Sequence, residues 1–178
     1  MLIAKNKLKT NIVEYILYMW RVEDLLRAMN FDMDLIKTNL IQIQTEDKAT
    51  LKEIEAWYED LISKMTLEGV EKTGHLNEIT EKVQELNFLH FILTSSMPDE
   101  NYIHHLEKIK PLLEEFRVKS KMENNSDVEV CLHALNMKLL LKLQQKELTK
   151  ETNAAFEEFS KLLATLSKRY KNQYDLVN

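Results

Sequence analysis

Glycine and proline are scarce in this sequence, with two residues of each among 178. Tight β-hairpins and glycine-rich phosphate loops need glycine where the backbone adopts a positive φ, so both are nearly excluded. The chain is instead rich in Leu, Glu, Lys and Met, which are good helix formers. The composition therefore predicts an all-α protein.

Cysteine and long apolar runs are also lacking. Cys131 is the single cysteine, so no intrachain disulfide can form. Its apolar context, VEVCLHAL, is typical of a buried structural thiol in a reducing compartment. No apolar run reaches the ~18 residues of a membrane-spanning helix, and Glu14 interrupts the stretch that follows the first lysines. We expect a cytoplasmic protein with no membrane association.

Positive charge does not dominate any part of the composition. The formal net charge is −5, which is the opposite of the basic footprint of a nucleic-acid-binding domain. A small acidic excess is typical of a soluble surface. We therefore expect no nucleic-acid partner.

Apolar residues recur at spacings of three and four, as in helices that pack nearly parallel or antiparallel. The pattern predicts six long helices, at about residues 11–29, 46–66, 75–94, 98–121, 126–146 and 149–171, and a short one at 35–43. Short connections make sequential helices antiparallel. We predict one domain over residues 1–178, an up-and-down helical bundle in which residues 1–10 form a loose arm. Residues 67–75, which contain both glycines, form a candidate hinge.

The histidines do not follow any familiar metal-binding pattern. A di-iron bundle site needs Glu-x-x-His on two helices, and no histidine here has a glutamate three residues before it. The sequence also lacks H-E-x-x-H, a cysteine cluster and a glycine-flanked nucleophile. We therefore predict no metal site, no cofactor site and no catalytic residue of a known type.

The first long helix has two different sides. Its charged residues after position 20 are Arg21, Glu23, Asp24 and Arg27, and all four lie opposite a continuous apolar arc on a helical wheel. Glu23 and Arg27, and Arg21 and Asp24, have spacings that allow surface ion pairs. We interpret these charges as one solvated stripe.

Up to Trp20, the same helix is apolar on nearly every side and therefore needs a second packing partner. The side chains concerned are Val13, Ile16, Leu17 and Trp20. The partner could be another helix of the chain, a second subunit or a ligand. Because Trp is favoured at protein interfaces, these four residues are our candidate interface of a homodimer.

Four polar residues occupy apolar positions and are candidates for buried polar groups or a pocket. Glu14 stands alone in the apolar half of the first helix, with Tyr18 one turn later. His90 lies in an apolar seam, and Asn136 lies among leucines. A buried imidazole or amide must find hydrogen-bond partners. For His90, the nearby Asn87 and Thr94 are the expected ones.

The segment NIVEYILYMWRVEDLLRA resembles the N-terminal signature of an uncharacterised family of small helical proteins from the Bacteroidetes. The resemblance is strongest over residues 3–36. It implies a small all-helical cytoplasmic protein. It implies no activity, cofactor or catalytic residue.

Three functional hypotheses follow from the sequence. The first is a non-enzymatic bundle that acts through protein contacts as a homodimer. The second is a bundle that binds a small apolar or aromatic ligand. Its pocket would be lined by Trp20, Phe88, His90, Phe91 and Met137. The third is an enzyme with an unfamiliar site near Glu14, Arg21 and His90.

Overall fold

The computed structural model describes residues 2–45 and 47–177, and its regular structure is helical throughout these ranges. Side chains are described for residues 3–45 and 47–172. The elements are α1 (Leu2–Thr10), α2 (Ile12–Ala28), α3 (Met33–Ile36), η1 (Lys37–Ile41), α4 (Lys48–Leu67), α5 (Asn77–Phe91), η2 (Ile92–Ser96), α6 (Glu100–Lys119), α7 (Asp127–Leu143) and α8 (Lys150–Val177). The all-α prediction is confirmed.

Polar side chains mark where most of these helices begin. In each case a side-chain oxygen of the residue before the helix accepts a hydrogen bond from a backbone N–H of the first turn, which has no partner within the helix. The residues are Asn11, Asp32, Asp47, Asp99 and Ser126. Helix α5 lacks such a cap, because Leu76 precedes it and has no polar side chain.

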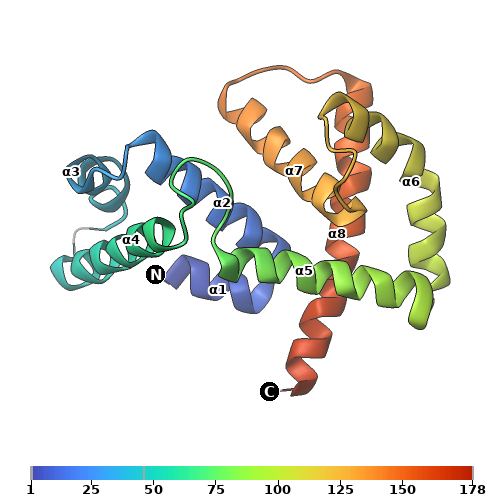
Figure 1. Ribbon diagram of the computed structural model, residues 1–178, viewed down its shortest axis with the longest axis horizontal. Coiled ribbons are helices and arrows are strands. Elements are labelled where there is room, and N and C mark those ends of the chain that lie inside the picture. Colours follow the sequence, from blue (N-terminus) through green and yellow to red (C-terminus); the bar gives the residue numbers. More distant parts are fainter. Residues whose placement is uncertain (1, 46, 178) are drawn as a thin grey trace.

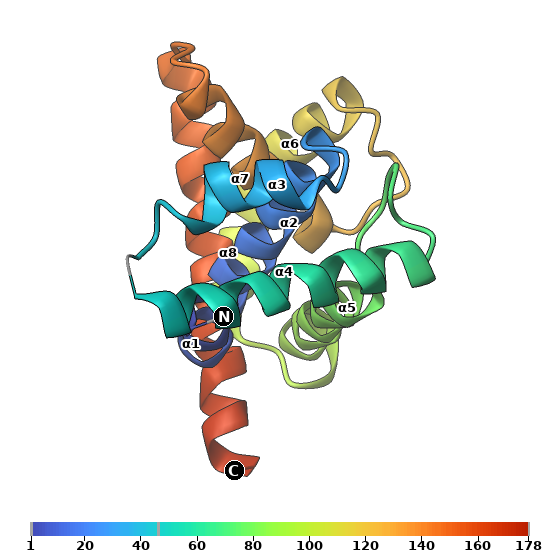
Figure 2. The same cartoon turned by 90° about the vertical axis from the view of Figure 1, so that its left-hand side faces the viewer.

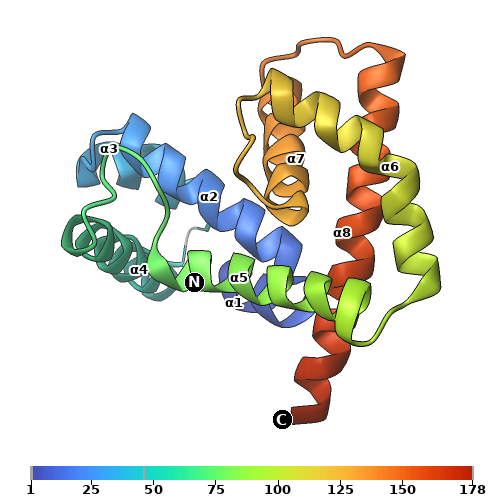
Figure 3. The same cartoon turned by 45° about the vertical axis from the view of Figure 1, so that its right-hand side comes forward.

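The long helix α8 runs from top to bottom through the right-hand part of Figure 1 and contacts α2, α5, α6 and α7. Its inward face is mostly apolar, with Phe156, Phe159, Leu162, Leu163 and Leu166 all buried, and it also includes the buried Ser167. Helix α5 crosses α8, and α6 and α7 pack beside its upper part (Figures 1 and 3). Since α8 packs against helices far from it in sequence, the arrangement matches an up-and-down bundle only roughly.

The N-terminal third of the chain forms a second part of the fold. Here α3 and η1 lie beside α4, and α1 packs on α2 (Figure 2). The expected loose arm at residues 1–10 is instead helix α1 in its described part, Leu2–Thr10, and Ala4 is buried. Asn11 separates α1 from α2, because its extended backbone breaks the helix while its side chain caps α2.

Helix α2 is buried on almost every side, with ten of its 17 residues in the interior. It packs against α1, α5, α7 and α8. The candidate interface residues Val13, Ile16, Leu17 and Trp20 are therefore buried within the chain itself, with exposed fractions of 8% or less. This corrects the interface prediction: the second partner of the helix is other helices of the same chain.

No helix within the described ranges is both long enough and apolar enough to cross a membrane.

Candidate functional site

A completely buried carboxylate lies where α2 meets the start of α5. Glu23 is the one charged side chain among the described residues that is buried, and its exposed fraction is 0%. Its Oε1 accepts a 2.9 Å hydrogen bond from the backbone N–H of Leu76, and its Oε2 lies 2.5 Å from Nδ1 of His75. The prediction of a solvated stripe is therefore wrong for Glu23, because the segment before α5 folds over it.

Two carboxylates replace the missing side-chain cap of α5. Glu23 accepts the Leu76 N–H, and Oε2 of Glu68 accepts the Asn77 N–H at 2.7 Å. The N-terminus of a helix exposes unpaired N–H groups and the positive end of its dipole, so carboxylates are favoured there. Glu23 thus joins two elements that are far apart in the sequence.

Arg27 holds the connection between α4 and α5 against α2. Its guanidinium donates to the carbonyl oxygens of Val70, at 3.1 and 3.3 Å, and of Gly74. It also pairs with Asp24 at 3.0 Å. The surface ion pair expected between Glu23 and Arg27 is not formed, because Arg27 pairs with Asp24 and Glu23 with His75. The segment proposed as a hinge, 67–75, thus has several hydrogen bonds to α2.

The indole of Trp20 packs between two imidazoles. It stacks on His75 with a centroid distance of 4.5 Å and an interplanar angle of 13°, and it lies 4.9 Å from the ring of His133. The Trp20 Nε1 is buried and has no hydrogen-bond partner among the described residues. This aromatic cluster connects α2, the α4–α5 segment and α7.

The surroundings of His133 disfavour its protonated form. Burial lowers the pKa of this imidazole, and electrostatic repulsion with His75 lowers it further. The carboxylate of Glu129, one turn earlier on α7, opposes this effect only in part. A neutral imidazole has one donor and one acceptor nitrogen.

His133 also lines a groove of about 410 Å³ between α6 and α7. We call it the α6–α7 groove. Its lining residues come from the C-terminal end of α6, the turn that follows it and one face of α7. They are Phe116, Ser120, Met122, Asn125, His133, Asn136, Met137 and Leu140. The candidate residue Asn136 is thus a half-buried wall residue of this groove.

His90 has a different partner from the expected ones. Its Nδ1 lies 2.7 Å from the hydroxyl of Tyr102, and burial lowers its pKa. Thr94 donates to the backbone oxygen of His90 rather than to its ring, while the Asn87 side chain accepts from Ser126. His90 therefore forms a half-buried pair with Tyr102.

Glu14 and Tyr18 differ in their environments. Glu14 is 57% exposed and pairs with Lys7 at 2.7 Å, which corrects the prediction that it is a buried polar group. It also accepts a hydrogen bond from Asn11, so it supports the start of α2. Tyr18 is half-buried, and burial raises its pKa to about 12.

The residues of the two predicted sites do not come together. Trp20 is buried, while Phe88 and Phe91 are exposed by 65% and 54% on the outer side of α5. Met137 lies in the α6–α7 groove, and His90 pairs with Tyr102. Glu14 pairs with Lys7, so the hypothesis of a site shared with His90 is not supported by these contacts.

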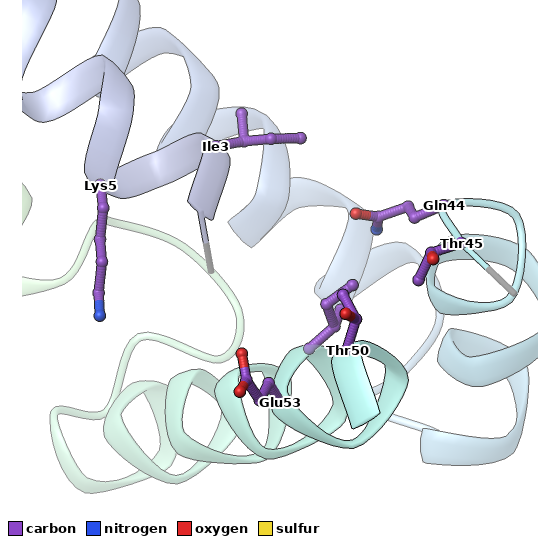
Figure 4. Close-up of a pocket in the computed structure, with 7 residues that line it drawn as sticks. Ile3, Lys5, Gln44, Thr45, Thr50 and Glu53 are labelled. Carbon is purple, nitrogen blue, oxygen red and sulfur yellow. The ribbon is translucent and has the colours of Figure 1, made fainter. Parts of the chain in front are cut away.

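A second hollow, of about 230 Å³, lies between α1, the segment after η1 and the start of α4 (Figure 4). Its polar side chains include Lys5, Gln44 and Glu53, which come from three different elements. These side chains lie apart around the hollow rather than converging on one point (Figure 4). We find no arrangement for a particular chemistry there.

The described metal-binding and nucleophilic side chains form no site of their own. Among the described side chains, of residues 3–45 and 47–172, no group of three or more His, Cys, Asp or Glu is placed to hold a metal ion. Cys131 is fully buried, and burial raises the pKa of its thiol. It is therefore a packing residue rather than a nucleophile.

A family model described as "Domain of unknown function (DUF4924)" matches residues 1–175. The chain belongs to this family. The match covers nearly the whole chain and is not restricted to residues 3–36, where we expect the strongest resemblance. No curated protein and no solved structure matches the chain.

The cluster of Trp20, Glu23 and His75 has only weak signals in the sequence. Glu23 lies next to the edge of the apolar arc of its helix, where a side chain can turn either inward or outward. Leu76 lacks a capping side chain, so the start of α5 needs an acceptor from elsewhere. Neither signal alone shows that Glu23 accepts the hydrogen bond at the start of α5.

Proposed function

We propose that this protein acts through protein contacts and forms a homodimer through the outer face of α5. The observation that carries the proposal is the exposure of Phe88 and Phe91, which lie three residues apart on one side of the helix. Aromatic side chains are enriched at the centres of protein interfaces. Contiguous apolar surface on a folded chain is typical of a binding face.

The apolar surface continues beyond these two rings. Ile92 lies one turn after Phe88, and it lines a hollow of about 410 Å³ together with Met97, which is 72% exposed. We call Phe88, Phe91, Ile92 and Met97 the α5 surface. The ion pair between Asp99 and Arg169 lies at the edge of the same hollow, where it would form part of a polar rim.

A second copy of the chain is the partner that we favour. In a two-fold symmetric dimer the same surface meets itself, so an apolar centre on one copy faces an apolar centre on the other. A two-fold axis between Phe88 and Phe91 would pack the four rings together. The buried face of α2 is not available for this contact.

Light scattering after size exclusion, at about 1 to about 100 μM protein, tests the proposal. We expect a dimer for the wild type and a monomer for Phe88→Ser/Phe91→Ser, with unchanged helix content. The control is Ile43→Ser/Leu67→Ser, which removes two exposed apolar side chains elsewhere and should leave the dimer intact. A wild-type monomer at every concentration would contradict the proposal.

A further inference from the structure

We propose that the α6–α7 groove binds a small uncharged aromatic or heterocyclic molecule that carries an amide-like hydrogen-bonding group. The proposal is independent of dimer formation, because the groove shares no residue with the α5 surface. It replaces the pocket predicted from the sequence, of which Met137 alone lines this groove.

The shape of the groove follows from the spacing of its lining residues. His133, Asn136, Met137 and Leu140 lie at i, i+3, i+4 and i+7 of α7 and so share one face of the helix. The opposite wall is formed by the end of α6 and the turn after it. A volume of about 410 Å³ lies within the usual range for small-molecule sites.

The polar groups of the groove have unused hydrogen-bonding capacity. Its polar side chains are Ser120, Asn125, His133 and Asn136. Within the described part of the chain, none of these side chains is hydrogen-bonded to another residue. Two of them, His133 and Asn136, lie one turn apart on the same face of α7. Together they offer donors and acceptors to a ligand that carries both.

The groove carries no formal charge, which restricts the ligand. None of its described lining residues is an Asp, Glu, Lys or Arg, and burial lowers the pKa of His133, which disfavours its charged form. Arg117 lies next to the wall residue Phe116, but its guanidinium pairs with Asp127 and donates to the backbone of Asn125. A charged ligand would lose hydration here without gaining an opposite charge. An uncharged ligand is therefore favoured.

The apolar walls of the groove suit a flat ring, and aromatic side chains of the protein interior pack against them. Phe116 makes edge-to-face contacts with Phe156 and Phe159, at centroid distances of 6.2 and 6.1 Å. His133 packs against Trp20, which in turn stacks on His75. The groove is also lined by Met122 and Met137, whose flexible thioethers adapt to aromatic surfaces.

Three probes of the same size test the charge restriction. They are naphthalene-2-carboxamide, naphthalene-2-carboxylate and 2-naphthylmethylammonium, titrated into protein with ¹³C-labelled methionine methyl groups. We expect the carboxamide to bind with a dissociation constant on the order of 1 mM or lower, at least about tenfold tighter than either ion. Methyl shifts should be confined to Met122 and Met137. Equal binding of all three, no binding, or shifts centred on Met97 would each overturn the proposal.

Two variants test the residues directly. Asn136→Leu keeps the size of the side chain and removes its amide, and should weaken carboxamide binding about fivefold or more. Met137→Lys adds a cation at a partly exposed position and should shift the preference toward the carboxylate. Leu67→Lys makes the same charge change on α4 and should leave the preference unaltered. Unchanged selectivity in Met137→Lys would reject the groove as the binding site, whatever the behaviour of Asn136→Leu.

Discussion

The Oε2 atom of Glu23 lies 2.5 Å from Nδ1 of His75, and the two residues are 52 positions apart in the sequence. The carboxylate is fully buried, whereas the side chain of His75 is 27% exposed. Since the other carboxylate oxygen accepts the Leu76 N–H, Glu23 both caps α5 and orients the imidazole. The relationship connects the stability of the fold to the aromatic cluster behind the groove.

Removal of this carboxylate should destabilise the protein strongly. Glu23→Ala leaves the buried Leu76 N–H and the His75 Nδ1 without their acceptor, and we expect a loss of about 3 kcal/mol in the free energy of unfolding. Glu23→Gln retains an acceptor oxygen and should cost less. Urea unfolding measures both. Asp24→Asn, at a partly exposed neighbouring position, should cost less than about 1 kcal/mol. Equal losses at positions 23 and 24 would contradict this assignment.

Arg27 should control the mobility of the α4–α5 segment. Arg27→Lys keeps the charge but cannot reach Val70 and Gly74 with the same planar fork. We expect faster amide hydrogen exchange in residues 68–76 and a loss of about 1–2 kcal/mol in stability. Exchange in α8 that accelerates as much as in 68–76 would mean that the change is global rather than local.

Two half-buried histidines should make the fold less stable in mild acid. Burial places the pKa values of His90 and His133 below their ordinary value of 6.5. The unfolded chain therefore takes up protons near pH 6.5, while the folded chain does so only at lower pH. The stability is complete above this range and falls as the pH drops through it, down to the folded pKa.

Urea unfolding between pH 7.5 and pH 5.5 measures this loss. His133→Gln should flatten the pH dependence, although Glu129 and His75 also influence the site electrostatically. His104→Gln, at an exposed position, should keep the wild-type slope. If the free energy of unfolding depends on pH equally in both variants, His133 does not cause the loss of stability in mild acid.

Cys131 should resist alkylation while the protein is folded. Its thiol is fully buried, so the reagent has no access to it, and burial raises its pKa, so little of the reactive thiolate forms. We expect iodoacetamide labelling at pH 7.5, followed by mass spectrometry, to be slow in buffer and rapid in denaturing urea. Labelling at equal rates in both conditions would contradict the burial of this side chain.

Local patterns of the sequence account for the helices and most of their boundaries. The scarcity of glycine and proline, the three-and-four spacing of apolar residues and caps such as Ser126 act within one or two turns. The N-terminal segment differs because the cap at Asn11 starts one helix without preventing another before it. Helix α1 packs against the rest of the fold through the buried Ala4.

The candidate site could be predicted only in part. Asn136 and Met137 are noticeable in the sequence, and both line the groove. Glu23 has the same surface pattern as Arg21 and Asp24, yet it alone is fully buried. A helical wheel gives the direction of a side chain but not what approaches it from another element. The sequence does not show that the segment before α5 passes over Glu23, and this path is what buries the carboxylate.

The sequence by itself determined that the chain is helical and where most helices begin, because propensity, capping and apolar periodicity are local properties. Only the tertiary structure decided that Glu23 caps a distant helix, that Trp20 lies between His75 and His133, and that Phe88 and Phe91 remain exposed. These outcomes depend on which helix faces which. Such contacts join residues that are far apart in the sequence, and no short segment encodes them.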